Sequence, residues 1–380
     1  MSVKDLFDVQ GFRTGAGSPI WLKGATPAKA HAKAVSLLQR SGAYLSHKTQ
    51  LDELAYSLQG SNAHYGVSRN PLDKQRLSGG SSSGAAVSVA RKESDIGLAT
   101  DTGGSIRVPA SYCGLYGLRP TYGSVSTSGL VPLAPRFDTA GVLTRDLESL
   151  RLAILALQSE AEVEDNSSAD WKDQNKAQSI DTLVWCDAIW QGVDPKLRDY
   201  AWRWYQQAEC AKHSLSPPIL NATERKNCFA ALQAESIWSA HGDWLNQHMT
   251  AFGADIQQRL RWGQSLLAQE SGRDTLAKAE QDWRLWQQHQ SQWLPQGAAL
   301  IMPTVPSIAP LIDDDPECQR DALLGLTSIA GLSGWPQLQC PVFIDGDLPH
   351  GLSLLGREQS DIALIEFATA FPFIGQAPHP

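Results

Sequence analysis

The order of predicted strands and helices along this chain of 380 residues favours an α/β fold. Near the N-terminus, residues 1–10 predict a strand that reaches a turn at Gly11. Residues 27–41 then predict a helix, because apolar residues recur there at helical spacing. Near the C-terminus, the apolar run AALIMPTVP predicts a strand and residues 319–333 predict a helix. Strands and helices therefore alternate at both ends of the chain.

The other elements follow from local patterns of apolar and turn-forming residues. In chain order we predict a short strand in AYL after Gly42, a helix over 51–58, a loop over 60–84, helices over 85–92 and 145–158, a polar surface excursion over 159–178, a strand in TLVWCDAIW, helices from about 195 to 292, strands in PQLQCPVF and HGLSLLG, and a closing helix over 360–371. The helical middle is rich in tryptophan. We expect most of these rings to pack in the core, with some left to line an aromatic substrate pocket.

Residues 95–123 differ from the rest of the chain, since they hold six glycines, two prolines and few charges. A segment of this composition cannot be one plain helix or one plain strand. It predicts tight backbone turns within an otherwise apolar setting.

Composition argues against several classes of protein. The net charge is −8 and no Lys/Arg cluster is present, so we expect no nucleic-acid partner. No apolar run reaches the roughly 18 residues that span a bilayer, and charges at positions 4, 5 and 8 argue against a signal peptide. The six cysteines form no CxxC pair and show no zinc spacing with histidine, so we expect no metal site. We therefore expect a cytoplasmic protein with no membrane partner.

The first candidate motif is Gly80-Ser81-Ser82-Ser83-Gly84, which matches the pattern G-x-S-x-G of a nucleophile elbow. In that interpretation Ser82 is the nucleophile of an esterase that uses a histidine base. The helix that must follow the motif is predicted, but the preceding residues NPLDKQRL make a poor buried strand. Glycine and serine also occur together in many loops, so the match is not specific.

The second candidate motif is Asp101-Thr102-Gly103, which is similar to the triplet of aspartic proteases. Such enzymes need two carboxylates that share one proton. The possible partner in FDTAG, over 137–141, lies too close in the sequence to belong to a second lobe. This interpretation is therefore weaker than the first.

The third candidate joins Val3-Lys4-Asp5, Gly79-Gly80-Ser81-Ser82 and the segment 101–107. The last two stand in GGSSSGAAVSVA and ATDTGGSIRVPASYCGLYGLRP, and Ser105 follows Ser81 by 24 positions. With these stretches the sequence resembles the amidase signature family of serine hydrolases. Within that family it is most similar to short amidases of the indole-3-acetamide-hydrolase type, through AYS, NAHYG and RNP and through TDTGGSIRVPASYCG.

The resemblance implies a catalytic triad of Ser105 as the nucleophile, Ser81 as the bridging serine after a cis peptide bond, and Lys4 as the base. A serine hydroxyl is a weak nucleophile until a neighbouring base takes its proton. A lysine serves as that base if it is neutral, and burial lowers the pKa of an ammonium group. Lys4 has apolar neighbours in the sequence, so we expect it to be buried.

The resemblance also assigns roles around the nucleophile. The backbone N–H groups expected to form the oxyanion hole are those of Thr102, Gly103, Gly104 and Ser105. The residues expected to support the site are Gly80, Ser82, Asp101 and Arg107. Of these, Asp101 and Arg107 are expected to form a buried ion pair that braces the nucleophile loop.

The fold that the resemblance implies is a single α/β domain, 1–380, in which a central mixed β-sheet is sandwiched by α-helices. Residues 1–158 and 296–380 are expected to form the sheet-bearing core. Residues from about 160 to 295 are expected to form a variable, helical, tryptophan-rich region on the substrate side.

The function that follows is that of an amidohydrolase without cofactor, which cleaves a small carboxamide C–N bond through an acyl-enzyme on Ser105 and releases ammonia or an amine. An aromatic primary amide such as indole-3-acetamide is the expected substrate type, and a homodimer is a candidate assembly. Two alternatives stay open, the Ser82–histidine esterase of α/β-hydrolase type and a catalytically inactive amidase-like binding protein. Only three residues precede Lys4. We weigh three possibilities: the strand that carries Lys4 is locked into the sheet, the natural start of the chain lies upstream, or a partner subunit covers this strand.

Overall fold

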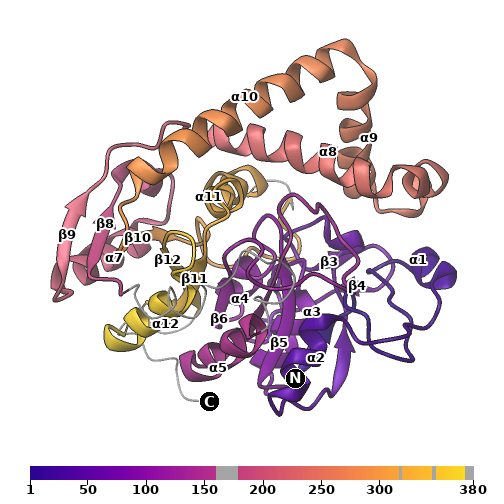
Figure 1. The fold of residues 1–380 in the computed structure, drawn as a ribbon, viewed down its shortest axis with the longest axis horizontal. Helices are drawn as coiled ribbons and strands as arrows, with labels where there is room; N and C mark the ends of the chain where they lie inside the picture. The colour runs from indigo at the N-terminus through magenta and orange to yellow at the C-terminus, as the bar shows by residue number, and fades with distance from the viewer. Residues whose placement is uncertain (160–178, 316–318, 345–347, 373–380) are drawn as a thin grey trace.

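The computed structural model describes residues 1–159, 179–315, 319–344 and 348–372. The predicted surface excursion over 159–178 lies, apart from its first residue, outside these ranges. In Figure 1 the first third of the chain, in indigo and purple, packs beside the C-terminal third, in orange and yellow. Both thirds contribute strands to one sheet, so the two ends of the sequence build one body.

The main sheet has ten strands in the order β2-β1-β5-β7-β6-β11-β12-β10-β8-β9. Their bounds are β1 (Ser2–Lys4), β2 (His47–Thr49), β5 (Ile96–Asp101), β6 (Tyr116–Arg119), β7 (Thr139–Thr144), β8 (Thr182–Trp185), β9 (Ala211–Ser214), β10 (Ala298–Pro303), β11 (Gln337–Phe343) and β12 (Pro349–Leu355). The pairs of β1 with β2 and β5, and of β8 with β9 and β10, are parallel, whereas the central pairs from β5 to β10 are antiparallel. The sheet is therefore mixed, as predicted.

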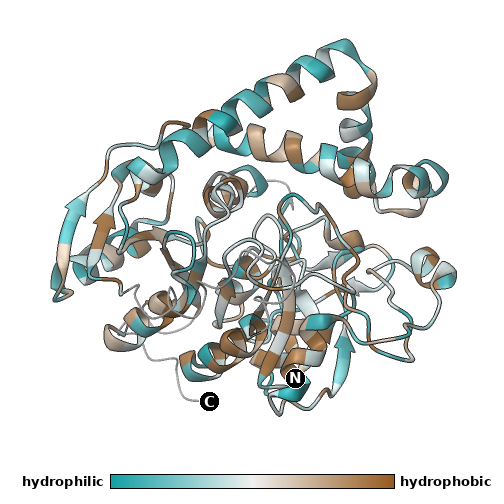
Figure 2. Ribbon diagram, viewed as in Figure 1, coloured by the Kyte–Doolittle hydropathy of each residue, from teal (hydrophilic) through white to brown (hydrophobic). Residues whose placement is uncertain are grey.

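Helices cover both faces of this sheet. One face carries α2 (Lys33–Arg40), α5 (Leu147–Gln158), α7 (Pro195–Gln207) and α12 (Asp361–Ala370), and the other carries α3 (Ser83–Ala90), α4 (Arg107–Tyr112) and α11 (Arg320–Ser333). Leu98 and Ala99 of β5 illustrate the arrangement, because these neighbours belong to the apolar cores on opposite faces and both are fully buried. At the edge of the sheet the hydropathy of neighbouring strands differs. Figure 2 shows that β8 is hydrophobic and that the outermost strand β9 is largely hydrophilic.

The middle of the chain forms a separate stack of long helices, α8 (Ala222–His248), α9 (Ala254–Ala268) and α10 (Glu270–Trp293), which lies over α11 in Figure 1. A capping box starts α8, since the Asn221 side chain accepts from the Glu224 N–H at 3.0 Å and Glu224 accepts from the Asn221 N–H at 2.8 Å. Trp286 of α10 is buried and donates to Ser333 Oγ of α11 at 2.9 Å. It packs helices together, as predicted for most of the tryptophans.

Several predicted elements differ from the observed ones. The strand over 1–10 is confined to Ser2–Lys4, AYL is not a strand although β2 follows it, and the strand in TLVWCDAIW ends at Trp185, before a 3-10 turn η2 (Asp187–Trp190). Elements that were not predicted are β5, α4 and β6, all within residues 95–123, together with β7, β9, α1 (Pro19–Gly24), the small hairpin β3 (Ser61–Asn62) and β4 (Gly66–Val67), and the 3-10 turn η3 (Met249–Ala251). Because β8 and β9 come from the middle segment, the sheet extends beyond the expected boundaries at 158 and 296.

The predicted helix over 51–58 is wrong. Only a 3-10 turn, η1 (Glu53–Ala55), forms there, and Leu54 and Ala55 have positive φ angles of 47° and 59°. Tertiary hydrogen bonds replace helical ones, since the Asp52 N–H donates to the Ser81 carbonyl at 3.3 Å and the Leu54 N–H donates to the Ala16 carbonyl at 2.9 Å. These bonds bend the segment around the loop that carries Ser81.

The strand that carries Lys4 is locked into the sheet, which is the first of the three possibilities given by the sequence. Strand β1 pairs with β2 on one side and with β5 on the other, and its residues are buried. The Met1 carbonyl also accepts from the Ser46 N–H at 2.9 Å. Within the described ranges, no helix is both long and apolar enough to cross a bilayer.

Candidate active site

A buried lysine lies among three hydroxyl groups at the end of β1. Lys4 Nζ donates to Ser81 Oγ at 2.7 Å, to Ser82 Oγ at 3.0 Å and to Thr100 Oγ1 at 2.8 Å. Lys4, Ser81 and Ser82 are fully buried, and Thr100 is 3% exposed. Two of the three expected triad residues therefore touch each other, although 77 positions separate them in the sequence.

The loop that carries Ser81 packs too closely for side chains at its glycines. The Gly80–Ser81 peptide bond is cis. A Cβ on Gly80 would lie 2.3 Å from Asp52 Oδ2 and 2.7 Å from the Gly60 nitrogen, so only glycine fits there. The loop then enters α3 at Ser83. The Ser83 hydroxyl is buried and has no hydrogen-bond partner among the described residues.

Ser105 follows the end of β5, and its loop is tied to the Ser81 loop. The Ser82 N–H donates to the Ser105 carbonyl at 3.3 Å, and Ser105 is 3% exposed. In the part of the chain that the structure describes, no hydrogen bond joins the Ser105 hydroxyl to the Ser81 hydroxyl. The two serine loops are thus in contact through the backbone.

An aspartate with two arginine partners fixes the turn around Ser105. Asp101 accepts from Arg107 Nη2 at 2.8 Å and Nε at 2.9 Å, and from Arg119 Nη1 at 3.2 Å. It also accepts from the N–H groups of Gly104 at 2.9 Å and Ile106 at 3.1 Å. Burial opposes ionisation, but the two guanidinium groups outweigh it and hold the pKa of Asp101 well below its usual range. Asp101 therefore stays a carboxylate that braces this turn.

The N–H groups expected to form the oxyanion hole differ in how they are engaged. The Gly104 N–H already donates to Asp101, so it would have to break this bond to reach an oxyanion. Within the described residues, the N–H groups of Thr102, Gly103 and Ser105 have no hydrogen-bond acceptor. The Gly103 carbonyl accepts from Thr327 Oγ1 at 2.7 Å, which fixes the orientation of the neighbouring peptide units.

Burial sets the electrostatic state of Lys4. Desolvation lowers its pKa from 10.5 to about 7, against the charges of Asp52, Asp101 and Asp138, which raise it. A lysine with this pKa is half neutral at pH 7, whereas an ordinary exposed lysine is almost fully protonated. Lys4 can therefore accept a proton near neutral pH.

Four further residues around the site were not predicted from the sequence: Asp52, Thr100, Arg119 and Asp138. Thr100 accepts from Lys4, and Asp138 Oδ1 accepts from Thr102 Oγ1 at 2.6 Å. The sequence offered a signal for Thr100, because it is a polar residue inside the apolar strand that leads to Asp101. No comparable signal marked Asp52, which was assigned to a helix.

The structure disfavours both competing motifs. Ser82 Oγ accepts from Lys4 and donates to the Thr100 carbonyl at 3.2 Å, and no histidine of the described chain hydrogen-bonds to it. Asp101 is paired with arginines, while Asp138 accepts from Thr102 and from the N–H groups of Leu133 and Ala134. Within the described residues no hydrogen bond joins the two carboxylates, so they do not form a proton-sharing pair. No group of three metal-ligating side chains occurs in the described ranges.

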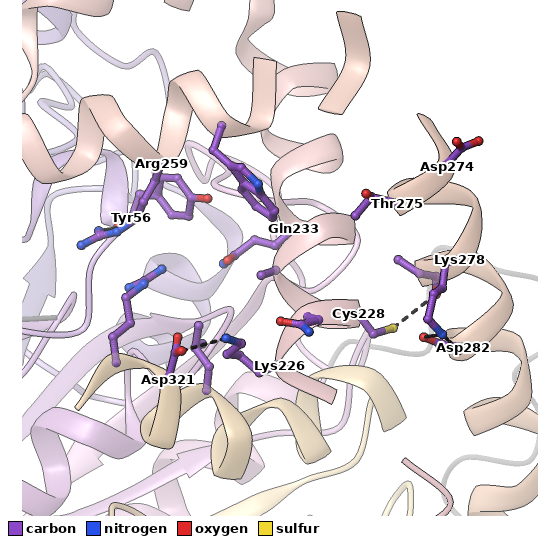
Figure 3. A pocket seen from close by; sticks show the side chains of 16 residues that line it. Tyr56, Lys226, Cys228, Gln233, Arg259, Asp274, Thr275, Lys278, Asp282 and Asp321 are labelled. Atoms are coloured by element: carbon purple, nitrogen blue, oxygen red, sulfur yellow. Dashed lines mark hydrogen bonds and ion pairs between the residues drawn. The ribbon is translucent and has the colours of Figure 1, made fainter. Parts of the chain in front are cut away.

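A cavity of about 570 Å³ is lined by α8, α9 and α10, together with α11 and Tyr56. Figure 3 shows Tyr56, Gln233 and Arg259 on one side and Asp274, Thr275, Lys278 and Asp282 on the other. Its wall also includes Trp262 and Leu324. Leu324 lines the cavity, and it also packs close to the loop that carries Ser105, since a Cβ on Gly103 would lie 3.5 Å from Leu324 Cδ2. Ser105, Ser81 and Lys4 do not line the cavity themselves.

Comparison with known proteins places this chain and its fold in a class. A family model described as Amidase matches residues 1–365, so the chain belongs to the amidase (amidase signature) family. It is an amidohydrolase, a hydrolase that acts on carboxamide C–N bonds, as the sequence predicted.

Individual relatives agree with this assignment. The chain is 34% identical to Amidase 1 from Arabidopsis thaliana over 97% of this chain and 92% of that protein. It is 31% identical to 2-amino-5-chloromuconic acid deaminase from Comamonas testosteroni over 99% of this chain and 81% of that protein. A crystal structure of an amidase superposes with a TM-score of 0.82 at 27% identity, and covers 97% of this chain and 83% of that one.

Proposed function

We propose that Ser105 is the nucleophile, Ser81 the proton relay and Lys4 the base in hydrolysis of a small carboxamide. The observation that supports this most is Lys4, which is fully buried, has a pKa lowered to about 7, and lies 2.7 Å from Ser81 Oγ. A neutral amine in this position can draw a proton from Ser81 as Ser81 takes one from Ser105. The contact between the two serine loops supports that relay.

The reaction then proceeds in two halves. Ser105 Oγ attacks the amide carbon while its proton passes through Ser81 to Lys4. The N–H groups of Thr102, Gly103 and Ser105 are the proposed donors to the oxyanion, and one such donor is worth roughly 3 kcal/mol of the barrier. The Lys4 ammonium returns the proton through Ser81 to the leaving nitrogen, and the C–N bond breaks to release ammonia or an amine. Water attacks the acyl-enzyme by the same proton route, which frees the acid and restores Ser105.

The proposed substrate is an aromatic primary amide of the indole-3-acetamide type. The cavity of about 570 Å³ has room for such a group, and Tyr56, Trp262 and Leu324 give it apolar and aromatic walls. Two pairs of its charged side chains neutralise each other, with Lys226 2.8 Å from Asp321 and Lys278 2.9 Å from Asp282. A neutral aromatic acyl group fits these walls better than a charged one.

The test is ammonia release from a panel of primary amides that includes acetamide, benzamide and indole-3-acetamide. Wild-type protein should hydrolyse aromatic members, and Ser105→Ala should abolish the reaction. If the folded protein releases no ammonia from any amide of the panel, the alternative of a catalytically inactive amidase-like binding protein replaces this proposal.

A pair of variants on α11 tests the proposed pocket. Leu324→Trp fills part of the cavity, so it should raise KM for the aromatic amide at least tenfold and leave acetamide nearly unaffected. Leu326→Trp is the matched control, because Leu326 lines a different cavity, of about 370 Å³. An equal loss for both substrates in Leu324→Trp would place the acyl group elsewhere.

The homodimer and the cytoplasmic location stay predictions. Light scattering of the purified chain decides the first, since a dimer has twice the monomer mass of 41.3 kDa. Fractionation of cells that produce the protein decides the second.

A further inference from the structure

A buried carboxylate lies on the outer side of the Ser81 loop, and the mechanism above does not use it. Asp52 is 1% exposed, and its Oδ2 accepts from the N–H groups of Gly60 at 3.0 Å and Gln59 at 3.3 Å. Its own N–H donates to the Ser81 carbonyl at 3.3 Å. The carboxylate also packs on Gly80, where a Cβ would lie 2.3 Å from Oδ2. Asp52 thus holds both residues of the cis peptide.

Asp52 differs from the other two acids that act on Lys4. Asp101 is neutralised by Arg107 and Arg119. Asp138 also interacts with Arg119, and its carboxylate accepts from Thr102 and from the backbone. Within the described chain, Asp52 has no basic side chain as an ion-pair partner, and its Oδ1 has no hydrogen-bond partner. Lys4 is the cation that acts on it.

We propose that Asp52 is a positioning residue for the reaction, which seats the Ser81 peptide and, through its negative charge, stabilises the ammonium that forms when Lys4 accepts the proton. The inference rests on the proposed function of Lys4 as the base. The direct contacts of Lys4 Nζ are the neutral hydroxyls of Ser81, Ser82 and Thr100, so none of them supplies a counter-charge. Asp52 supplies this charge without contacting substrate.

The ionisation of Asp52 and of Lys4 together sets the expected pH dependence of the reaction. Burial raises the pKa of Asp52 to about 6, against hydrogen bonds from Gly60, Ser57 and Gln59 and the charge of Lys4. Asp52 is therefore ionised at the pH where Lys4 becomes neutral, near 7. Removal of its negative charge makes the Lys4 ammonium less stable. Lys4 should then lose its proton at a lower pH and become a weaker base.

The experiment measures the rate of fluorophosphonate labelling of Ser105, together with kcat/KM for an amide, from pH 5 to 9. In Asp52→Asn the acid limb of both profiles should move down by at least about one pH unit, and the plateau should fall roughly three- to tenfold. Asparagine keeps an acceptor for the Gln59 and Gly60 N–H groups, so circular dichroism should show an unchanged fold.

Glu53→Gln is the matched control. Glu53 is the adjacent acid and is also buried, but it accepts from the Gly253 N–H at 3.1 Å and lies 3.2 Å from His64. Its substitution should leave the acid limb in place. An equal shift in Glu53→Gln would mean that any lost negative charge has this effect, and would overturn the proposal.

A second variant guards against misfolding of Asp52→Asn. Ser57→Ala removes a nearby hydroxyl that lowers the pKa of Asp52 and leaves the carboxyl group intact, so it should move the limb in the same direction by a smaller step. If wild type is labelled and neither variant moves the limb, the role of Asp52 is refuted while Lys4 stands. If wild-type Ser105 is not labelled at any pH, the proposed function fails and this role fails with it.

Discussion

Replacement of Asp101 by asparagine tests whether the contacts of Asp101 with Arg107 and Arg119 hold the loop that carries Ser105 in place. The buried carboxylate of Asp101 neutralises Arg107 and Arg119 and accepts three backbone N–H groups, from Gly104, Ile106 and Arg107. Asp101→Asn keeps the shape of the side chain but leaves two buried guanidinium groups without their counter-charge. It also replaces one acceptor oxygen by an NH₂ group that cannot accept from them.

The size of the effect follows from the burial of all three side chains, which are fully inaccessible to solvent. Removal of one partner from a buried ion pair costs about 3–5 kcal/mol. For a chain of this length, with roughly 2.1 cal/mol/K of unfolding entropy per residue, this lowers Tm by about 4–6 °C. The loop that carries Ser105 should also lose its geometry, and misplacement by about 1 Å can cost roughly 100-fold in kcat.

Calorimetry and amide hydrolysis at 25 °C measure the two effects, with Asp361→Asn as the control. Asp361 is also buried, but it accepts from the Thr121 N–H at 2.8 Å and has no arginine partner among the described residues. Its variant should lose about 1–3 kcal/mol of stability and keep full kcat. If Asp101→Asn keeps both the wild-type Tm and the wild-type kcat, the reasoning about the brace is refuted.

The remaining predictions concern the base, its surroundings and the helical stack. If the neutral form of Lys4 is the base, as proposed, its lowered pKa of about 7 means that kcat/KM should fall about tenfold per pH unit below 7 and level off above it. A profile that is flat from pH 5 to 8 would contradict this assignment. Thr100→Val removes the acceptor 2.8 Å from Lys4 and should lower kcat roughly three- to tenfold; an unchanged kcat would make that contact irrelevant. Arg136→Ala loses the bidentate contact with Glu280 at 2.5 and 3.0 Å. Urea unfolding should therefore show a free energy of unfolding lower by about 1 kcal/mol. An unchanged free energy of unfolding would mean that this partly exposed pair does not hold α10.

The sequence predicted the α/β class and most elements with regular apolar patterns, such as α5, α11 and α12. It did not predict elements whose conformation depends on distant residues. The segment 51–58 has the apolar spacing of a helix, but its backbone bonds to Ala16 and Ser81 instead. Strand β7 was missed because Gly141 interrupts its apolar pattern, and the Leu118 carbonyl approaches that position too closely for any side chain.

Site residues that belong to a sequence motif could be predicted. Site residues whose role depends on contacts with distant parts of the chain could not be predicted in the same way. Lys4 and Ser81 were paired through a family resemblance, since nothing in their local sequence indicates a contact across 77 positions. The role expected for the Gly104 N–H did not anticipate that Asp101 would accept from it. Asp52 could not be identified either, because burial turns an ordinary acidic residue into a charge that acts on Lys4.

The most direct test of the account is to map the residue that a fluorophosphonate labels. Peptide mass spectrometry of the labelled wild-type protein should place the adduct on Ser105, and Lys4→Met should abolish labelling while the fold is retained. An adduct on Ser82, or full labelling of Ser105 in Lys4→Met, would contradict the assignment of Ser105 as the nucleophile and Lys4 as its base.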